Sequence, residues 1–209
     1  MLITNILRPI ALLLLGAALG TAHARHTQRD GFAIVIDPES YRQAKAEVDD
    51  YAIAIREVQG LHVHLVIDRW GVPDSLRAVL MALHGSDRHP IAGAVLVGDI
   101  PVPMVRDAQH LTSAFKMSQH RPWDESSVPS DRFYDDFSLR FQFLRRDSVH
   151  SHLFYYTLLA DGAQRLHPDL FTGRIRPTDA GGTSRYAKLR DYLRKATRQK
   201  RQPEPVRST

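Results

Sequence analysis

The sequence predicts an α/β fold, with a mostly parallel, doubly wound sheet of about four core strands flanked by helices and a small antiparallel extension. Two observations predict it. Strand-length runs that are apolar throughout alternate with longer segments whose apolar residues recur at helical spacing. Glycines and prolines stand at the boundaries of these segments, where helices end or begin.

The part of the chain between residues 32 and 97 is expected to alternate between strands and helices. The expected elements are a strand at 32–36, a helix at 39–59 that Gly60 ends, a strand at 61–67, a helix that Pro73 opens and Gly85 closes, and a strand at 92–97. Parallel strands joined by helices form right-handed crossovers. We therefore expect one parallel sheet with helices packed against it.

The second part has weaker periodicity. Residues 100–130 carry four prolines and no sustained period, which predicts a long surface loop with one helical turn. Beyond it we expect an antiparallel hairpin of 139–144 and 153–159, a fourth core strand at 169–175, and a helix from Thr183 that ends before Gln202. The apolar face predicted for that helix consists of Tyr186, Leu189, Tyr192, Leu193 and Ala196.

Residues 1–24 have the pattern of a secretory signal peptide. A positive charge at Arg8 precedes an apolar run, and Ala22-His23-Ala24 provides a small-x-small cleavage site. The run is too short for the roughly 20 residues that span a bilayer, so we expect no stable membrane span after cleavage; an uncleaved anchor is the alternative. The expected organisation is a secreted or periplasmic protein with a single domain at 25–200 and a disordered tail at 201–209.

Composition restricts the chemistry. The 209 residues contain no cysteine, so this polypeptide has no disulfide, no thiolate metal site and no cysteine nucleophile. The net charge is +5, but residues 185–209 alone hold nine Lys or Arg against two acidic residues. Because no aromatic interleaving or recognition motif accompanies this run, we interpret it as a solvated helix face and expect no nucleic-acid partner.

Three motifs follow one another along the chain. The segment 94–101 reads AVLVGDIP, the segment 130–136 reads SDRFYDD, and the segment 170–175 reads LFTGRI before the helix that bears Tyr192. In this order they resemble the N-terminal half of the catalytic domain of gingipain-type cysteine peptidases, over about residues 60–195. The resemblance implies a caspase-like, Rossmann-like sheet. The matching positions are Gly98, Asp99, Asp131, Tyr134, Gly173 and Arg174.

The resemblance also implies what the chain lacks. In the family, a His-Gly pair and the nucleophilic Cys lie on strands after the helix that follows the Gly-Arg strand, and this sequence ends at that helix. Its one His-Gly pair, His84-Gly85, precedes the Gly98-Asp99 strand and is better explained as a helix end. We therefore expect no catalytic residue here and a protein that is inactive alone, either a truncated product or a piece to which a second chain or a C-terminal half supplies the dyad.

Two other classes of function stay open from the residues. The alternative is a non-catalytic, secreted module that binds a ligand or a protein through its strand ends and the loop at 100–130. A metal-dependent hydrolase that uses histidines and aspartates ranks last. His62 and His64 share one strand face, as do His150 and His152, but no third ligand can be named, so we interpret them as polar or partly buried residues.

Carboxylates and one arginine are the remaining candidate site residues. Asp99 lies at the carboxyl end of a central strand, where ligands bind in open α/β sheets; capping of the turn or pairing with an arginine is the simpler interpretation. Arg174 is expected to pair with Asp99 or Asp131. Asp131, Asp135 and Asp136 could supply oxygen ligands to Ca²⁺, although an acidic turn with Asp131 as cap is favoured. We expect no other cofactor.

Overall fold

The protein is an α/β structure. The computed structural model describes residues 29–111 and 117–202. The main elements are β1 (Gly31–Ile36), α1 (Pro38–Gln59), β2 (His62–Ile67), α2 (Pro73–His84), β3 (Ile91–Val97), β4 (Val102–Arg106), α3 (Trp123–Ser126), β5 (Val128–Pro129), α4 (Arg132–Asp135), β6 (Phe141–Arg146), β7 (Leu153–Leu158), β8 (Phe171–Ile175) and α5 (Arg185–Arg201).

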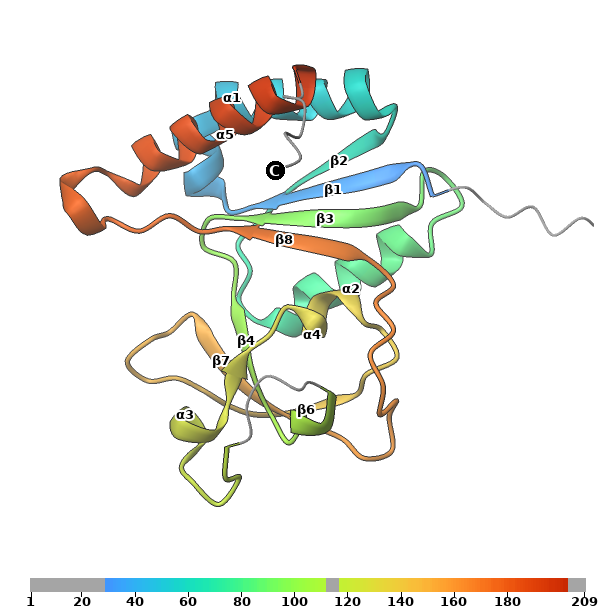
Figure 1. The fold of residues 1–209 in the computed structure, drawn as a ribbon, viewed down its shortest axis with the longest axis vertical. Helices are drawn as coiled ribbons and strands as arrows, with labels where there is room; N and C mark the ends of the chain where they lie inside the picture. Colours follow the sequence, from blue (N-terminus) through green and yellow to red (C-terminus); the bar gives the residue numbers. More distant parts are fainter. Residues whose placement is uncertain (1–28, 112–116, 203–209) are drawn as a thin grey trace, which may run out of the picture.

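Sheet A is the predicted parallel sheet. Its four strands lie in the order β2-β1-β3-β8, and every neighbouring pair is parallel (Figure 1). β1 is buried at every position, and β3 is buried at all but one, because helices cover both faces. The predicted strands and helices of the first part and the predicted fourth core strand are therefore confirmed.

Alternating residues of the strands feed two apolar cores. The upper face of sheet A packs against α1 and α5, with Ile55, Leu189 and Leu193 over β1 and β3 (Figure 1). The lower face packs against α2 and α4, with Leu76 and Phe133 beneath the same strands. The layers are thus helix, sheet, helix, as expected of a doubly wound arrangement.

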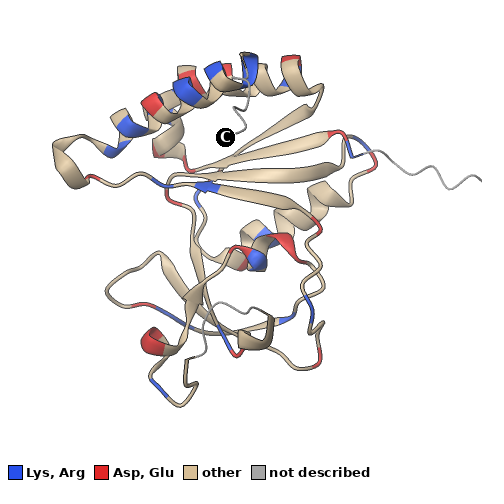
Figure 2. Cartoon of the chain, viewed as in Figure 1, with Lys and Arg blue, Asp and Glu red and all other residues tan. Residues whose placement is uncertain are grey.

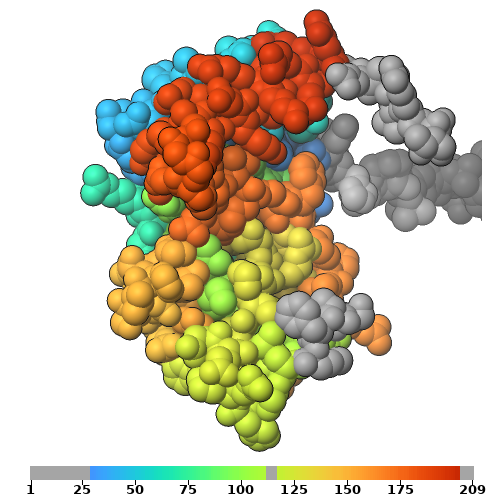
Figure 3. Space-filling model, turned by 60° about the vertical axis from the view of Figure 1, so that its left-hand side comes forward, coloured from blue at the N-terminus to red at the C-terminus, as the bar shows by residue number. Residues whose placement is uncertain are grey.

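A second sheet lies below sheet A. Sheet B has the order β5-β4-β7-β6; β4 and β7 are parallel, and the other two pairs are antiparallel. The predicted hairpin is confirmed as β6 and β7, but it belongs to this separate mixed sheet. The space-filling view shows the red α5 layer above the orange segment that contains β8, with the yellow-green segments of the sheet B region below (Figure 3).

The prediction of a loop over residues 100–130 was wrong. Part of that segment is β4, which pairs with both β5 and β7. The strand was missed because of Pro103. Proline has no backbone N–H to donate to a neighbouring strand, so a proline within an apolar run weighs against a strand. Here the Pro103 carbonyl still accepts a hydrogen bond from the Ser130 amide at 2.9 Å. The single predicted helical turn corresponds to α3.

Helix α5 explains the basic C-terminal segment. Three of its arginines bond to α1: Arg194 to Glu47 at 2.5 Å, Arg201 to Asp50 at 2.7 Å, and Arg190 to a backbone carbonyl. The blue and red positions of the two helices interleave along the top of the molecule (Figure 2). Arg194 and Arg201 thus pair with carboxylates within the fold, as Arg185 does with Asp99.

Some predictions lie beyond the described residues. The signal peptide at 1–24 and residues 203–209 of the predicted tail fall outside them. Among residues 29–111 and 117–202, no helix combines the length and apolar character that a membrane span needs.

Candidate functional site

The turn after β3 is held by the turn after β1. Asp37 begins α1 as its N-cap, and its Oδ1 accepts from the Ser40 amide at 2.9 Å. Its Oδ2 accepts from the Asp99 amide at 2.8 Å. Gly98 directly precedes Asp99 and has φ +80°. A Cβ at this position would collide with Asp37 Oδ2 and Ser40 Oγ. In open α/β sheets, ligands bind at the topological switch point, where the strand order reverses. In sheet A, the side chains of Asp37 and Ser40 occupy the space beside Gly98 at this point.

Asp99 and Arg174 have different ionic partners. The Asp99 carboxylate accepts from Arg185 Nη2 at 2.5 Å, at the start of α5. Arg174 on β8 instead forms a fork with Asp131, from Nη2 to Oδ1 at 2.7 Å and from Nε to Oδ2 at 3.1 Å. Of the two expected partners of Arg174, Asp131 is the one observed. The simpler interpretation of Asp99, pairing with an arginine, also agrees with the structure, although the arginine is Arg185.

Arg174 joins all three motifs. Besides Asp131 it donates to the carbonyls of Ile100 at 2.9 Å and Pro101 at 3.1 Å, which follow Gly98-Asp99 in the chain. Tyr134 donates to the same Pro101 carbonyl at 2.9 Å. Burial raises the pKa of Tyr134, so its hydroxyl stays protonated and continues to donate. Arg174, Asp131 and Tyr134 are thus connected to one another through the Pro101 carbonyl and the ion pair, and they form the motif cluster at the carboxyl end of β3 and β8.

The three aspartates do not face one another as ligands would. Asp131 binds Arg174, whereas Asp135 accepts from Thr172 Oγ1 at 2.5 Å and pairs with Arg132 at 2.7 Å. Asp136 accepts the His167 amide at 2.6 Å. Burial raises the pKa of Asp135. The expectation that Asp131 caps backbone amides was wrong, because its side chain makes no cap to α4.

No metal centre emerges from the part of the chain that the structure describes. In residues 29–111 and 117–202, no three histidine, aspartate or glutamate side chains gather in a way that would hold an ion. His84 forms a hydrogen bond with the Ile91 carbonyl at the amino end of β3, at 3.2 Å. That end is opposite to the Gly98-Asp99 turn, so His84 does not belong to the motif cluster, and Gly85 is the C-cap residue of α2.

A cavity opens beside the outer strand of sheet A. It measures about 320 Å³ and lies on the upper face over β8. Phe171 is 59% exposed there and stacks on Phe32, with ring centroids 5.8 Å apart. Nothing lies within 4 Å of where a Gly173 Cβ would be. The other lining residues include Tyr51, Tyr192 and Lys200.

Tyr192 was predicted on the buried face of α5, and that prediction was wrong. Its side chain is 53% exposed, whereas Leu189, Leu193 and Thr197 are buried. Residue 192 precedes Leu193 by one position, which turns it about 100° around the helix, since 3.6 residues complete a turn. The tyrosine therefore leaves the core stripe and lines the cavity over β8.

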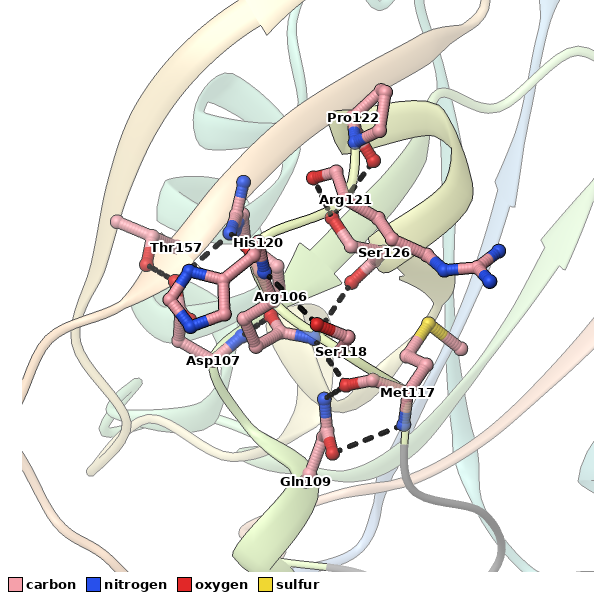
Figure 4. Close-up of polar contacts among 11 residues, drawn as sticks. Arg106, Asp107, Gln109, Met117, Ser118, His120, Arg121, Pro122, Ser126 and Thr157 are labelled. Atoms are coloured by element: carbon pink, nitrogen blue, oxygen red, sulfur yellow. Dashed lines mark hydrogen bonds and ion pairs between the residues drawn. The ribbon is translucent and has the colours of Figure 1, made fainter.

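A second, more enclosed cavity lies in the sheet B region. It measures about 300 Å³, and half of its lining residues are apolar, among them Val105, Ala108 and Leu166, while the other half are polar and include Arg106 and Arg132. Several of the lining residues belong to a network of hydrogen bonds (Figure 4). Gln119 is central, since it accepts from the Asp107 amide at 2.8 Å and donates to the Ser126 carbonyl at 3.2 Å.

Sequence reasoning missed Asp37, Arg185 and Phe171. Asp37 carried a signal, because Asp before Pro at the end of an apolar run is a typical helix start. Arg185 and Phe171 carried none, since their roles depend on contacts with residues distant in sequence.

Comparisons of the chain with models of protein families, with curated proteins and with solved structures find no match.

Proposed function

We propose that this chain is an exported, gingipain-related scaffold that does not cleave peptides alone. A further polypeptide, either a second chain or a C-terminal half, docks along β8 and supplies the histidine and the cysteine of the dyad. A thiolate and a base within hydrogen-bond reach are indispensable to that chemistry, and these 209 residues contain no thiol.

The motif cluster supports the family assignment. The three segments lie far apart in the chain, yet Arg174 bonds to residues of both other segments. A chance set of short motifs has no reason to share one hydrogen-bonded cluster. The proposal therefore treats Gly98, Asp131 and Arg174 as framework residues that hold the carboxyl end of the sheet.

The open side of β8 is the observation that carries the docking step. Parallel strands are normally buried on both faces, and an edge strand presents a row of unpaired backbone groups. In the described residues β8 pairs only with β3, and its upper face leaves Phe171 59% exposed beside the cavity of about 320 Å³. A further strand added to this edge would pair the free backbone groups and cover the ring.

The coding sequence beyond the codon of Thr209, and in the adjacent reading frames, provides the first test. We expect it to encode a strand that ends in His-Gly and a strand that ends in Cys. Co-expression of that polypeptide with this chain should give a complex that cleaves Arg- or Lys-ended peptides and is stopped by a thiol blocker. This chain alone should show no such cleavage.

Matched variants locate the docking surface. Phe171→Lys places a charge on the exposed ring of β8 and should weaken the complex about tenfold, which corresponds to about 1.4 kcal/mol of lost apolar contact. Phe143→Lys is the control, because Phe143 is also a strand phenylalanine, 51% exposed, but lies on β6. The proposal fails if no such polypeptide is encoded, if this chain alone shows thiol-dependent cleavage, or if both variants weaken the complex equally.

The enclosed cavity of sheet B supports a second candidate, a module that binds a small apolar ligand. Cavities of about 300 Å³ that combine apolar walls with polar groups are typical ligand sites, and Arg132 would attract an anionic group. We expect the dye anilinonaphthalene sulfonate to bind at one saturable site. Ala108→Trp should fill the cavity and abolish that binding, whereas Phe171→Lys should not. Unchanged dye binding in the Ala108 variant would exclude this candidate.

A further inference from the structure

Three histidines gather at the amino-terminal end of sheet A. His62 and His64 lie on β2, which is the outer strand on the side away from β8, and His89 lies in the connection between α2 and β3. Asp30 directly precedes β1. These four residues come from three separate segments of the chain. They lie at the opposite end of the sheet from the motif cluster, so the inference below is independent of the proposed function.

The rings are in direct contact. His62 stacks on His89 with ring centroids 4.2 Å apart and an angle of 11° between the planes. His64 meets His62 edge-on at 4.7 Å. Asp30 supplies the carboxylate of the cluster, and it accepts from His89 Nδ1 at 2.8 Å. One negative charge therefore stands against three groups that can each take up a proton.

The same residues tie the backbone together. The His62 amide donates to the Asp30 carbonyl at 2.7 Å, and His64 Nε2 donates to the His89 carbonyl at 2.9 Å. The Gly31 amide donates to the Pro90 carbonyl at 3.0 Å. His89 itself has φ +51°, a left-handed conformation that a non-glycine residue keeps only when its contacts hold it. Ring contacts and strand attachment thus occur at one place.

The charges that face His62 are mostly positive. They are His64 on its own strand, His89 from the connection before β3, and Arg56 from the last turn of α1, with Asp30 as the opposing charge. Partial desolvation, His64, His89 and Arg56 lower the pKa of His62 below its usual 6.5, and Asp30 opposes them. A lowered pKa means that the folded form binds the proton less well than the unfolded form. The contribution of His62 to the stability of the folded form is therefore fully present above pH 6.5, and it is lost as the pH falls through the folded-state pKa.

We propose that His62, His64 and His89 form an acid-responsive latch on β2. When the rings are neutral, they stack and hold the start of β2 against β1 and the His89 connection. When a second ring of the cluster gains a proton, like charges lie within a stacking distance with one carboxylate to balance them. The start of β2 then opens locally while the rest of sheet A stays folded.

Nuclear magnetic resonance on the full chain tests the latch. The imidazole signals, followed from pH 8 to pH 4.5, should show His62 titrating below 6.5. Hydrogen-exchange protection of the position-62 and Gly31 amides, corrected for intrinsic rates, should fall at least about threefold between pH 7.5 and pH 5.5. Amides in the centre of β3 should keep their protection over the same range.

Three variants separate the latch from general acid sensitivity. His62→Gln keeps a polar side chain but no proton site, so the fall in protection should vanish. Arg56→Gln removes one repelling charge; it should raise the pKa of His62 and make the fall smaller. His120→Gln changes an exposed histidine outside the cluster and should leave the fall unchanged. Titration of His62 at or above 6.5, or an equal fall of protection in wild type and His62→Gln, overturns the proposal.

Discussion

Replacement of Gly98 by alanine is expected to lower the free energy of unfolding by about 3 kcal/mol. Gly98 has φ +80°, and a left-handed conformation costs a residue with a Cβ about 1–2 kcal/mol. The added methyl would also push aside the Asp37 carboxylate, which caps α1 and binds the Asp99 amide. Thermal unfolding followed by circular dichroism should show a melting temperature lower by roughly 6–12 °C.

Gly60→Ala separates the two causes of this effect. Gly60 ends α1 with φ +66°, but nothing lies within 4 Å of where its Cβ would be. This control should lose only the conformational cost, about 1–2 kcal/mol. If Gly98→Ala and Gly60→Ala lose the same free energy, Asp37 does not hold the turn after β3 in the way described.

Replacement of Arg174 by alanine is expected to cost roughly 3 kcal/mol. The Arg174 side chain is 17% exposed, and its removal leaves the Asp131 carboxylate and the Ile100 carbonyl without their donor, while the Pro101 carbonyl keeps only Tyr134. Arg174→Lys should recover only part of the loss, because an ammonium cannot form the fork with the carboxylate. Urea unfolding at pH 7 measures the difference.

Arg140→Ala is the matched control for an arginine in an ion pair. Arg140 pairs with Asp161 at 2.7 Å, but the two side chains are 60% and 62% exposed. Such exposed pairs contribute less than about 1 kcal/mol. A loss in Arg174→Ala no greater than in Arg140→Ala would mean that the motif cluster is a surface arrangement rather than the connection between β3, β8 and α4.

The strands and helices of sheet A followed from the sequence because each has a local cause. The apolar run of β1 is buried at every position, and α1 has an N-cap at Asp37 and a left-handed glycine at its end. Nothing in the pairing of these elements opposes their local preferences. Agreement between local and global signals is what makes such a segment predictable.

β4 and Tyr192 show where such reasoning stops. β4 contains Pro103, and it pairs with β7, which lies about 50 residues later in the chain. The residues of β4 alone therefore did not predict a strand. Tyr192 differs from a core residue by a single helical position. Likewise, Arg174 was expected to find a carboxylate, but the choice of Asp131 over Asp99 is fixed by which face of β8 the side chain leaves.

The bonds between α1 and α5 also set an order of events during synthesis. Arg190 and Arg194 bond to residues 147 positions earlier in the chain. The part of the upper face of sheet A that α5 covers therefore stays uncovered until nearly the whole described chain has left the ribosome. Contacts of such sequence separation form late and slow the folding of a domain. Since Arg194 and Arg201 pair with carboxylates of α1, salt should slow the docking of α5 more than the folding of the lower layer.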